Sequence, residues 1–334
     1  MAEINEKHEG STGFDPCIRT EDIGFSPGEM YSCPACGRMN PPNRIKCLYC
    51  GDEFEVQSEN AAAVKLTLRR LESWENGFNL ILPTVVTKPD TVKAAALLSL
   101  NVVDLLSILD LSSAIPIARV ESMKAAGILI AKLAGFGLKC SVVSDASLDA
   151  DKPPIRLRNI GFRDSSIEFT NFNTRLVTEM ASNDLALIVP GILTSSKVES
   201  LEKKRSGKIK VLEETATAAD ESVLDLYSRR DPVGFRVQMS GFDFSMLGEE
   251  KALVASENMR RLLVRLKENS PKAKVVTDYQ KVLHALGTIW EIEARRDPQG
   301  LQRSGFGKVE FGSVASTNNL RQFTKYSRLQ WHLL

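Results

Sequence analysis

The chain contains 334 residues, of which 43% are hydrophobic and 25% are charged. This composition is typical of a globular chain with room for two or three domains, and it excludes collagen-like, low-complexity and wholly disordered proteins. The 43 basic and 42 acidic side chains nearly cancel, so the net charge of +1 gives no overall attraction to nucleic acid or to an acidic membrane.

Residues 1–28 are polar, contain glycine and show no hydrophobic period, which predicts a mobile tail. They also lack the apolar core that a secretory signal needs. Because four of the six cysteines cluster like metal ligands and not like a disulfide framework, we expect a cytoplasmic protein.

A compact cysteine module follows over residues 29–52. Its four cysteines have the spacing C-x2-C-x10-C-x2-C and are Cys33, Cys36, Cys47 and Cys50. Two residues between paired cysteines let one tight turn point both sulfurs at one ion, and Gly37 and Gly51 relax the backbone after each turn. Four thiolates complete tetrahedral Zn(II) and leave no position for water, so we expect one structural zinc ion. Iron in a rubredoxin-like site is the alternative.

Around these cysteines the chain resembles the Ran-binding-protein-type zinc finger, W-x-C-x2-4-C-x3-N-x6-C-x2-C, with Tyr31 in place of the tryptophan and Asn40 at the asparagine position. Members of that family bind ubiquitin or single-stranded RNA. Ubiquitin is not indicated, because Gly37 and Arg38 stand where the ubiquitin-binding members carry Thr-Phe. The module is equally similar to the tetra-Cys zinc ribbon of bacterial multidomain proteins. Both resemblances cover residues 31–51 only, and the remainder resembles no functionally characterised family.

An α/β domain is expected over residues 61–150, after a short polar linker at 53–62. Its first helix is predicted to start at Ala61 and to place Val64, Leu68, Leu71 and Trp74 on one face.

The most apolar stretch of the chain, 94–117, is long enough to span a bilayer. Asp104, Asp110 and Pro116 lie within it, and a carboxylate in hydrocarbon is costly. We therefore expect buried core helices here, the first of them capped by Asp90 or Thr91.

A β-α-β unit is the clearest pattern in the chain. After a buried extended segment at 79–86, it comprises a strand at 116–120, a helix at 121–137 and a strand at 138–145. The unit resembles one half of a ferredoxin-like split sandwich, a fold that hosts many unrelated functions. Cys140 in its second strand is expected to be a small buried hydrophobe.

A strand-rich domain with closing helices is expected over residues 155–334. Seven strands are predicted, over 155–162, 165–172, 184–193, 197–202, 208–214, 222–228 and 234–245. The sequence KKRSGK at 203–208 predicts an exposed basic hairpin turn, and amphipathic helices are predicted over 252–269 and 275–289. Strands followed by a helix make the order of elements over 155–269 similar to that of a pleckstrin-homology-like fold. The fold class predicted for the whole chain is α+β.

No phosphate-binding loop, nucleophile elbow or zinc-protease helix motif occurs in the sequence. Asp225 and Asp243 could form a catalytic carboxylate pair if their strands adjoin, although turn and cap roles are favoured. His284 lies in a predicted helix, where a boundary residue is favoured over a catalytic base. We therefore expect a protein that is not an enzyme.

The C-terminal residues 295–334 carry seven basic and two acidic side chains. Within them, residues 322–334 interleave basic and aromatic side chains, which allows docking on the parent domain or binding of a partner or nucleic acid. The function we expect is that of a zinc-binding, non-enzymatic adaptor or scaffold that recognises another protein. The alternative is a regulator that binds single-stranded RNA through Arg38, Arg44 and Lys46 of the finger together with this basic C-terminal tail.

Overall fold

The computed structural model of the chain describes residues 28, 30–41, 46–54, 68, 70–72, 74–83, 89–110, 113–205, 208–305 and 308–334. The chain divides into two compact units, residues 1–66 and 67–334. The boundary expected at 151–154 falls inside the second unit. The mobile tail expected over 1–28 and the linker over 53–62 lie largely outside the described residues. The first part of the helix expected from Ala61 does too, but the described residues 68, 70–72 and 74 are not helical, so the prediction that this helix includes Leu71 and Trp74 was wrong.

The first unit contains a short antiparallel hairpin, β1 (Tyr31–Ser32) and β2 (Met39–Asn40), in which Tyr31 pairs with Asn40. Among the residues of this unit that the structure describes, the buried hydrophobic ones are Cys33, Cys47 and Phe54. The Tyr31 ring meets the Phe54 ring edge-on, with the centroids 5.0 Å apart. A hydrophobic cluster of this size contributes little to folding, so binding of a metal ion would stabilise the module.

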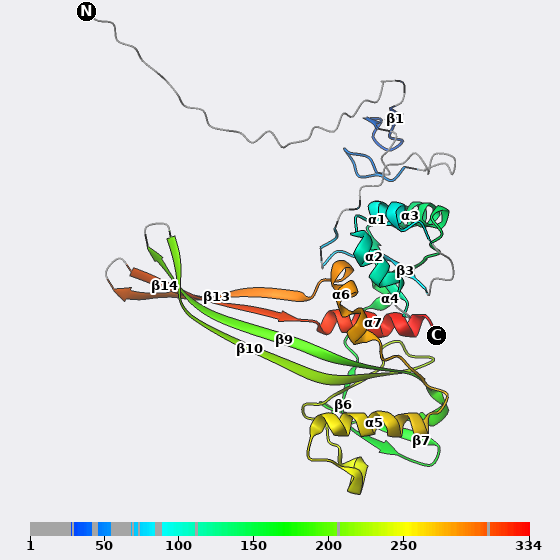
Figure 1. Cartoon of the computed structure of the whole chain (residues 1–334), viewed down its shortest axis with the longest axis vertical. Helices are drawn as coiled ribbons and strands as arrows, with labels where there is room; N and C mark the ends of the chain where they lie inside the picture. Colours follow the sequence, from blue (N-terminus) through cyan, green and yellow to red (C-terminus); the bar gives the residue numbers. More distant parts are fainter. Residues whose placement is uncertain are drawn as a thin grey trace, which may run out of the picture. The chain divides into compact units, whose positions relative to one another are not determined.

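The second unit begins with a three-stranded sheet (Figure 1). Strand β3 (Phe78–Leu82) lies between β4 (Ile115–Val120) and β5 (Ser141–Ser144) and is antiparallel to both. Helix α3 (Met123–Gly135) connects β4 to β5, as predicted. The β-α-β pattern is therefore confirmed, whereas its classification as half of a ferredoxin-like sandwich stays a prediction.

Two short helices, α1 (Thr91–Leu98) and α2 (Val102–Leu109), occupy most of the apolar stretch at 94–117. The side chain of Asp90 caps α1, and that of Asn101 caps α2. Among the described residues, no single helix is long and apolar enough to cross a membrane; α1 and α2 meet that criterion only as a pair, bent by 111°.

A large sheet dominates the rest of the second unit, with the strand order β13-β14-β9-β10-β11-β6-β7-β8 and with β12 paired to β9. Its strands are β6 (Ile155–Phe162), β7 (Ser166–Asn171), β8 (Val177–Ala181), β9 (Leu185–Arg205), β10 (Lys208–Ser228), β11 (Phe235–Gln238), β12 (Lys274–Val275), β13 (Glu293–Gly305) and β14 (Lys308–Asn318). The mixed α+β class is confirmed by this sheet and the helices around it.

The predicted strands at 184–193 and 197–202 are one 21-residue strand, β9, and those at 208–214 and 222–228 are likewise one strand, β10. The division of β9 was wrong because residues 194–196 carry only polar side chains, which interrupt the hydrophobic alternation of the strand. Backbone pairing of β9 with β10 and β14 continues through that segment. Figure 1 shows β9, β10, β13 and β14 running together as one long ribbon. The register of β9 with β10, in which Arg205 is opposite Lys208, confirms the hairpin at 203–208.

One hydrophobic core lies between these strands and helix α5 (Ala255–Asn269). Met259, Leu262 and Leu266 supply its helical side, and Leu157 and Phe169 are among the strand residues they join. Two 3-10 helices, η3 (Ser182–Asp184) and η4 (Ser245–Glu250), and the short helix α4 (Asp145–Leu148) complete the connections. The pleckstrin-homology-like classification stays a prediction.

The second predicted helix starts later than expected. Helix α6 (Tyr279–Ile289) begins at Tyr279, because Val275 belongs to β12, which pairs in parallel with β9. The hairpin of β13 and β14 was not predicted at all.

The C-terminal residues expected as a basic tail form helix α7 (Leu320–His332), and every residue from Gln322 to Gln330 is buried. Arg328 donates hydrogen bonds to the carbonyl oxygens of Leu148, Asp149 and Lys152. The segment therefore docks on its own unit, one of the two outcomes that the sequence allowed.

Two buried carboxylates anchor α7. Asp145 accepts a hydrogen bond from Lys325 (2.9 Å), and Asp225 accepts one from Ser327 (2.6 Å). Asp225 also holds Arg236 on the neighbouring strand through two hydrogen bonds of 2.6 and 2.7 Å. Because an uncompensated buried charge costs several kcal/mol, these contacts fix the position of the helix.

Close packing of α7 on β9 predicts a specific sensitivity at Gly191. A Cβ atom placed there would lie 2.3 Å from Phe323 Cε2. We expect Gly191→Ala to lower the free energy of unfolding by about 1–3 kcal/mol, as overpacked cores do. The control is Gly127→Ala on α3, where a Cβ meets nothing within 4 Å and alanine should stabilise the helix by about 0.5–1 kcal/mol. Urea unfolding measures the change in the free energy of unfolding for both variants. Equal changes would contradict the close packing of Phe323 on Gly191.

Candidate metal centre

The four predicted ligands come together in the first unit. Their Sγ atoms all lie within 4.8 Å of one another. The Sγ atoms of Cys33 and Cys50 are 3.6 Å apart, and those of Cys36 and Cys47 are 3.5 Å apart. Sulfur atoms on one tetrahedral ion with a metal–sulfur bond of about 2.3 Å would be about 3.8 Å apart. The cluster therefore fits a single metal ion held by four cysteines.

Two turns of the same construction supply the sulfurs in pairs. In the first, the N–H of Gly37 donates to the carbonyl of Cys33 (2.8 Å) and the N–H of Cys33 donates to the carbonyl of Arg38 (2.9 Å). The second repeats this pattern fourteen residues later, from Cys47 to Asp52, with hydrogen bonds of 3.1 and 2.8 Å. Gly37 and Gly51 adopt left-handed φ angles of 70° and 77°, which other residues rarely accept.

Asn40 links the two turns. It is fully buried, and its amide nitrogen donates to the carbonyl of Arg38 (2.8 Å) and to the Sγ of Cys47 (3.4 Å). Its side-chain oxygen accepts the N–H of Leu48 (2.8 Å). The sequence pattern singled out Asn40 without giving it a role; the structure shows that it orients a ligand, as residues around metal ligands commonly do.

The hydrogen bonds around the sulfurs separate their pKa values. Burial raises the pKa of Cys47, but N–H groups of Cys50 and Tyr49 and the amide of Asn40 donate to its sulfur and bring the pKa to about 6. At Cys50 the N–H of Asp52 lowers the pKa, but burial and the neighbouring sulfurs outweigh it and raise the pKa to about 12. The hydrogen bonds therefore favour the thiolate form of Cys47, and protons still held by the four thiols must leave when a metal binds.

Apolar side chains are exposed on the second turn. Leu48 is 54% and Tyr49 is 56% exposed, and the Arg38 guanidinium lies over the Tyr49 ring at 4.7 Å from its centroid. We call these three residues the knuckle patch. Lys46 pairs with Glu53 at 3.8 Å, and Arg44 lies outside the described residues.

The other candidates from the sequence do not assemble into a site. Asp225 is engaged with Arg236 and Ser327, whereas Asp243 accepts the N–H of Ser245 (2.9 Å) in the turn after β11. Cys140 lies just before β5 and is half-buried, so the expectation of a buried residue within that strand was wrong. Burial still raises its pKa to about 11, which does not suit a reactive thiol.

No family model, no curated protein and no solved structure matches the chain. The assignment of a metal centre therefore rests on the arrangement of the four cysteine sulfurs alone.

Because the four thiols form one site, we expect one metal ion per chain in freshly prepared, reduced protein. Cys33→Ser or Cys47→Ser should reduce the metal content below half an equivalent, since three thiolates no longer close the coordination shell. Cys140→Ser is the matched control and should retain the full equivalent, because Cys140 lies outside the cluster. Elemental analysis measures the metal content of each protein. Less than half an equivalent of metal per wild-type chain would contradict a metal site at these four cysteines.

Proposed function

We propose that the metal is one zinc ion in a closed, structural site. The support is the donor set, which consists of four cysteine sulfurs at distances suited to tetrahedral coordination. With all four positions filled by protein, the ion has no place for a water molecule or a substrate, so its role is to fold the module. Iron remains the alternative, and the same elemental analysis distinguishes the two metals.

The hairpin with two cysteine turns is compatible with both the Ran-binding-protein-type finger and the bacterial tetra-Cys ribbon. Asn40, which the finger pattern includes, contacts both turns. Thiol ligands that must stay reduced favour a cytoplasmic location.

In our proposal the protein is a non-enzymatic adaptor whose cysteine module contacts another protein through the knuckle patch. The observation that carries this proposal is the exposure of Leu48 and Tyr49 on one of the two cysteine turns, which a bound metal ion would hold in place. Exposed leucine and tyrosine side chains on a preorganised backbone lose little entropy on binding and bury apolar area. Arginine and tyrosine are also enriched among the residues that dominate binding energy at protein interfaces.

Binding of single-stranded RNA is the second candidate. The stacked pair of Arg38 and Tyr49 favours it, because an aromatic ring beside a guanidinium can stack on a base. Against it, Lys46 is already paired with Glu53. Within residues 322–334, Lys325 and Arg328 are buried and bonded within their own unit, so these two basic residues offer no support.

The adaptor proposal predicts that partner capture from native lysate depends on the apolar part of the knuckle patch. Combined Leu48→Ser and Tyr49→Ser should abolish capture by the tagged full-length chain, with or without nuclease. Leu253→Ser is the matched control, because Leu253 is fully exposed elsewhere in the chain. Metal content should be the same in all three proteins.

Fluorescence anisotropy with random single-stranded RNA tests the second candidate directly. Micromolar binding that the combined Arg38→Ala, Arg44→Ala and Lys46→Ala substitutions abolish, together with nuclease-sensitive capture, would overturn the adaptor proposal. Three lost phosphate contacts would also reduce the salt slope by about two to three units.

A further inference from the structure

The outer part of β10 is an open edge of the large sheet, along one border of the long ribbon in Figure 1. Strand β11 pairs with β10 over Val223–Leu226, and the N–H of Met239 extends this pairing to the carbonyl of Ser222 (3.0 Å). Residues 214–220, which we call the open segment, pair only with β9 among the residues that the structure describes. All side chains of the open segment are exposed.

Backbone hydrogen-bonding groups of the open segment face this edge. Successive residues of a strand direct their N–H and C=O groups to opposite edges. The Ser222 carbonyl faces β11, and the register with β9 is unbroken over 213–227, so the even-numbered residues of 214–220 direct their groups to the open edge. The Ala219 carbonyl faces the other way and accepts the hydroxyl of Ser195 on β9 (3.4 Å). A row of N–H and C=O groups that point away from a sheet is a template for another strand.

The strands at the two ends of the sheet, β8 and β13, are protected against such pairing. Strand β8 has only five residues. Strand β13 contains Pro298, and its register shifts between Pro298 and Leu301. Short strands, prolines and bulges are the devices that keep edges from pairing. The open segment, ETATAAD, contains no proline, no glycine and no register shift, so its edge is available to a partner.

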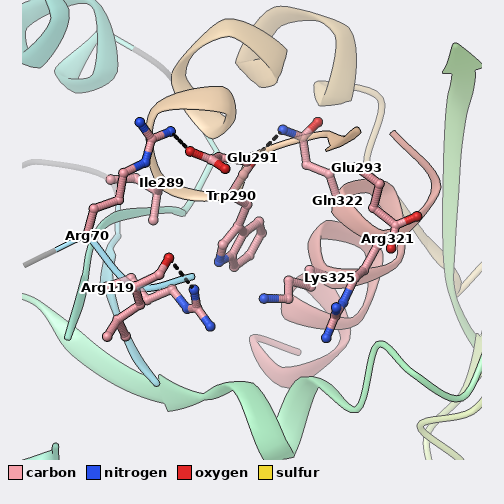
Figure 2. A pocket seen from close by; sticks show the side chains of 10 residues that line it. Arg70, Arg119, Ile289, Trp290, Glu291, Glu293, Arg321, Gln322 and Lys325 are labelled. Atoms are coloured by element: carbon pink, nitrogen blue, oxygen red, sulfur yellow. Dashed lines mark hydrogen bonds and ion pairs between the residues drawn. The ribbon is translucent and has the colours of Figure 1, made fainter. Parts of the chain in front are cut away.

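The hollow beside α7, by contrast, is satisfied within the chain (Figure 2). Arg70 pairs with Glu291 at its mouth, and Arg119 and Lys325 both pair with Asp145. Because the charges of the hollow are matched, the backbone edge of β10 is the feature of the second unit that calls for a partner.

The side chains of the open segment suit a second copy of the same strand in antiparallel orientation. Small residues lie between one acidic residue at each end. With Ala216 opposite its own copy across a two-fold axis, Glu214 lies opposite Ala218 of the second copy, and no like charges oppose each other. An axis at Thr217 would instead place Glu214 opposite Asp220, and like charges directly opposite are destabilising.

Backbone geometry favours the same axis. Pairing about Ala216 uses residues 214, 216 and 218 of each copy, all of which direct their groups to the open edge, and forms about six backbone hydrogen bonds. The pairing ends before the register shift between Val211 and Glu213 at one end and before β11 at the other.

Charge along the chain also favours an antiparallel copy. Residues 203–205 and 208–210 include five basic residues and no acidic one, whereas residues 213–221 include four acidic residues and no basic one. An antiparallel copy brings the basic segment of each chain toward the acidic residues 220–221 of the other. A parallel copy would bring like charges together, which is unfavourable.

We propose that the open segment is a dimer interface, through which two copies of this chain pair antiparallel about a two-fold axis at Ala216. The pairing joins the two large sheets into one continuous sheet. It closes at two copies, because each chain contributes the same edge.

Sedimentation velocity of the full-length protein over a concentration series tests the proposal. We expect a monomer–dimer equilibrium in the micromolar range with no larger species, because the paired segment is short. Ala216→Pro removes an N–H that faces the open edge and none that bonds β9, so it should abolish the dimer. Ala216→Val keeps the N–H and is the matched control that should still dimerise. A monomer at concentrations up to about 100 µM, or a dimer of folded Ala216→Pro protein, would overturn the proposal.

Charge changes at Ala218 test the register without altering the backbone, since this side chain is exposed. Ala218→Lys should tighten the dimer about threefold to tenfold, because each lysine would face Glu214 of the other copy. Ala218→Glu should weaken the dimer by a similar factor. Both effects should disappear when Glu214→Gln is added, and circular dichroism verifies the fold of each variant. Equal dimer affinity of the lysine and glutamate variants would contradict the pairing about Ala216.

Discussion

Burial of the polar helix α7 is the constraint on which the second unit depends. Nine consecutive residues, from Gln322 to Gln330, are buried, and most of them carry polar or charged side chains. Each such group needs a partner, because a buried charge or donor without one costs several kcal/mol. Asp145, next to the small sheet, and Asp225, inside the large one, supply two of these partners. One helix therefore ties both sheets together.

The sequence predicted those elements whose pattern is set by a local hydrophobic period. The β-α-β unit at 116–145 and helix α5 are where the periodicity places them. The long strands were divided wrongly, and the hairpin of β13 and β14 was missed, because their outer parts are polar and backbone pairing alone defines them. Helix α7 has an apolar face of Phe323, Tyr326 and Leu329, all fully buried. Its polar residues are buried as well, and the sequence did not show this, because their partners Asp145 and Asp225 are distant in the chain.

The candidate sites also divide into features that the local sequence sets and features that depend on contacts between distant residues. The metal ligands were predictable, because two short turns with the C-x2-C spacing bring their sulfurs together locally. The role of Asn40 required the structure, since it depends on which carbonyl and which sulfur its amide reaches. The shared ion pair of Arg119 and Lys325 with Asp145 could not be predicted at all, because the three residues lie far apart in the sequence.

Hydrogen exchange on a chain that ends at Asn319, and so lacks α7, tests the central role of this helix most directly. Amide protection should fall both in β3–β5 and in β9–β11, because Asp145 and Asp225 lose partners in the same deletion. Removal of residues 333–334 alone is the control and should leave protection unchanged, since Leu334 is exposed. Wild-type protection of both sheets in the chain without α7 would contradict the dependence on the buried helix.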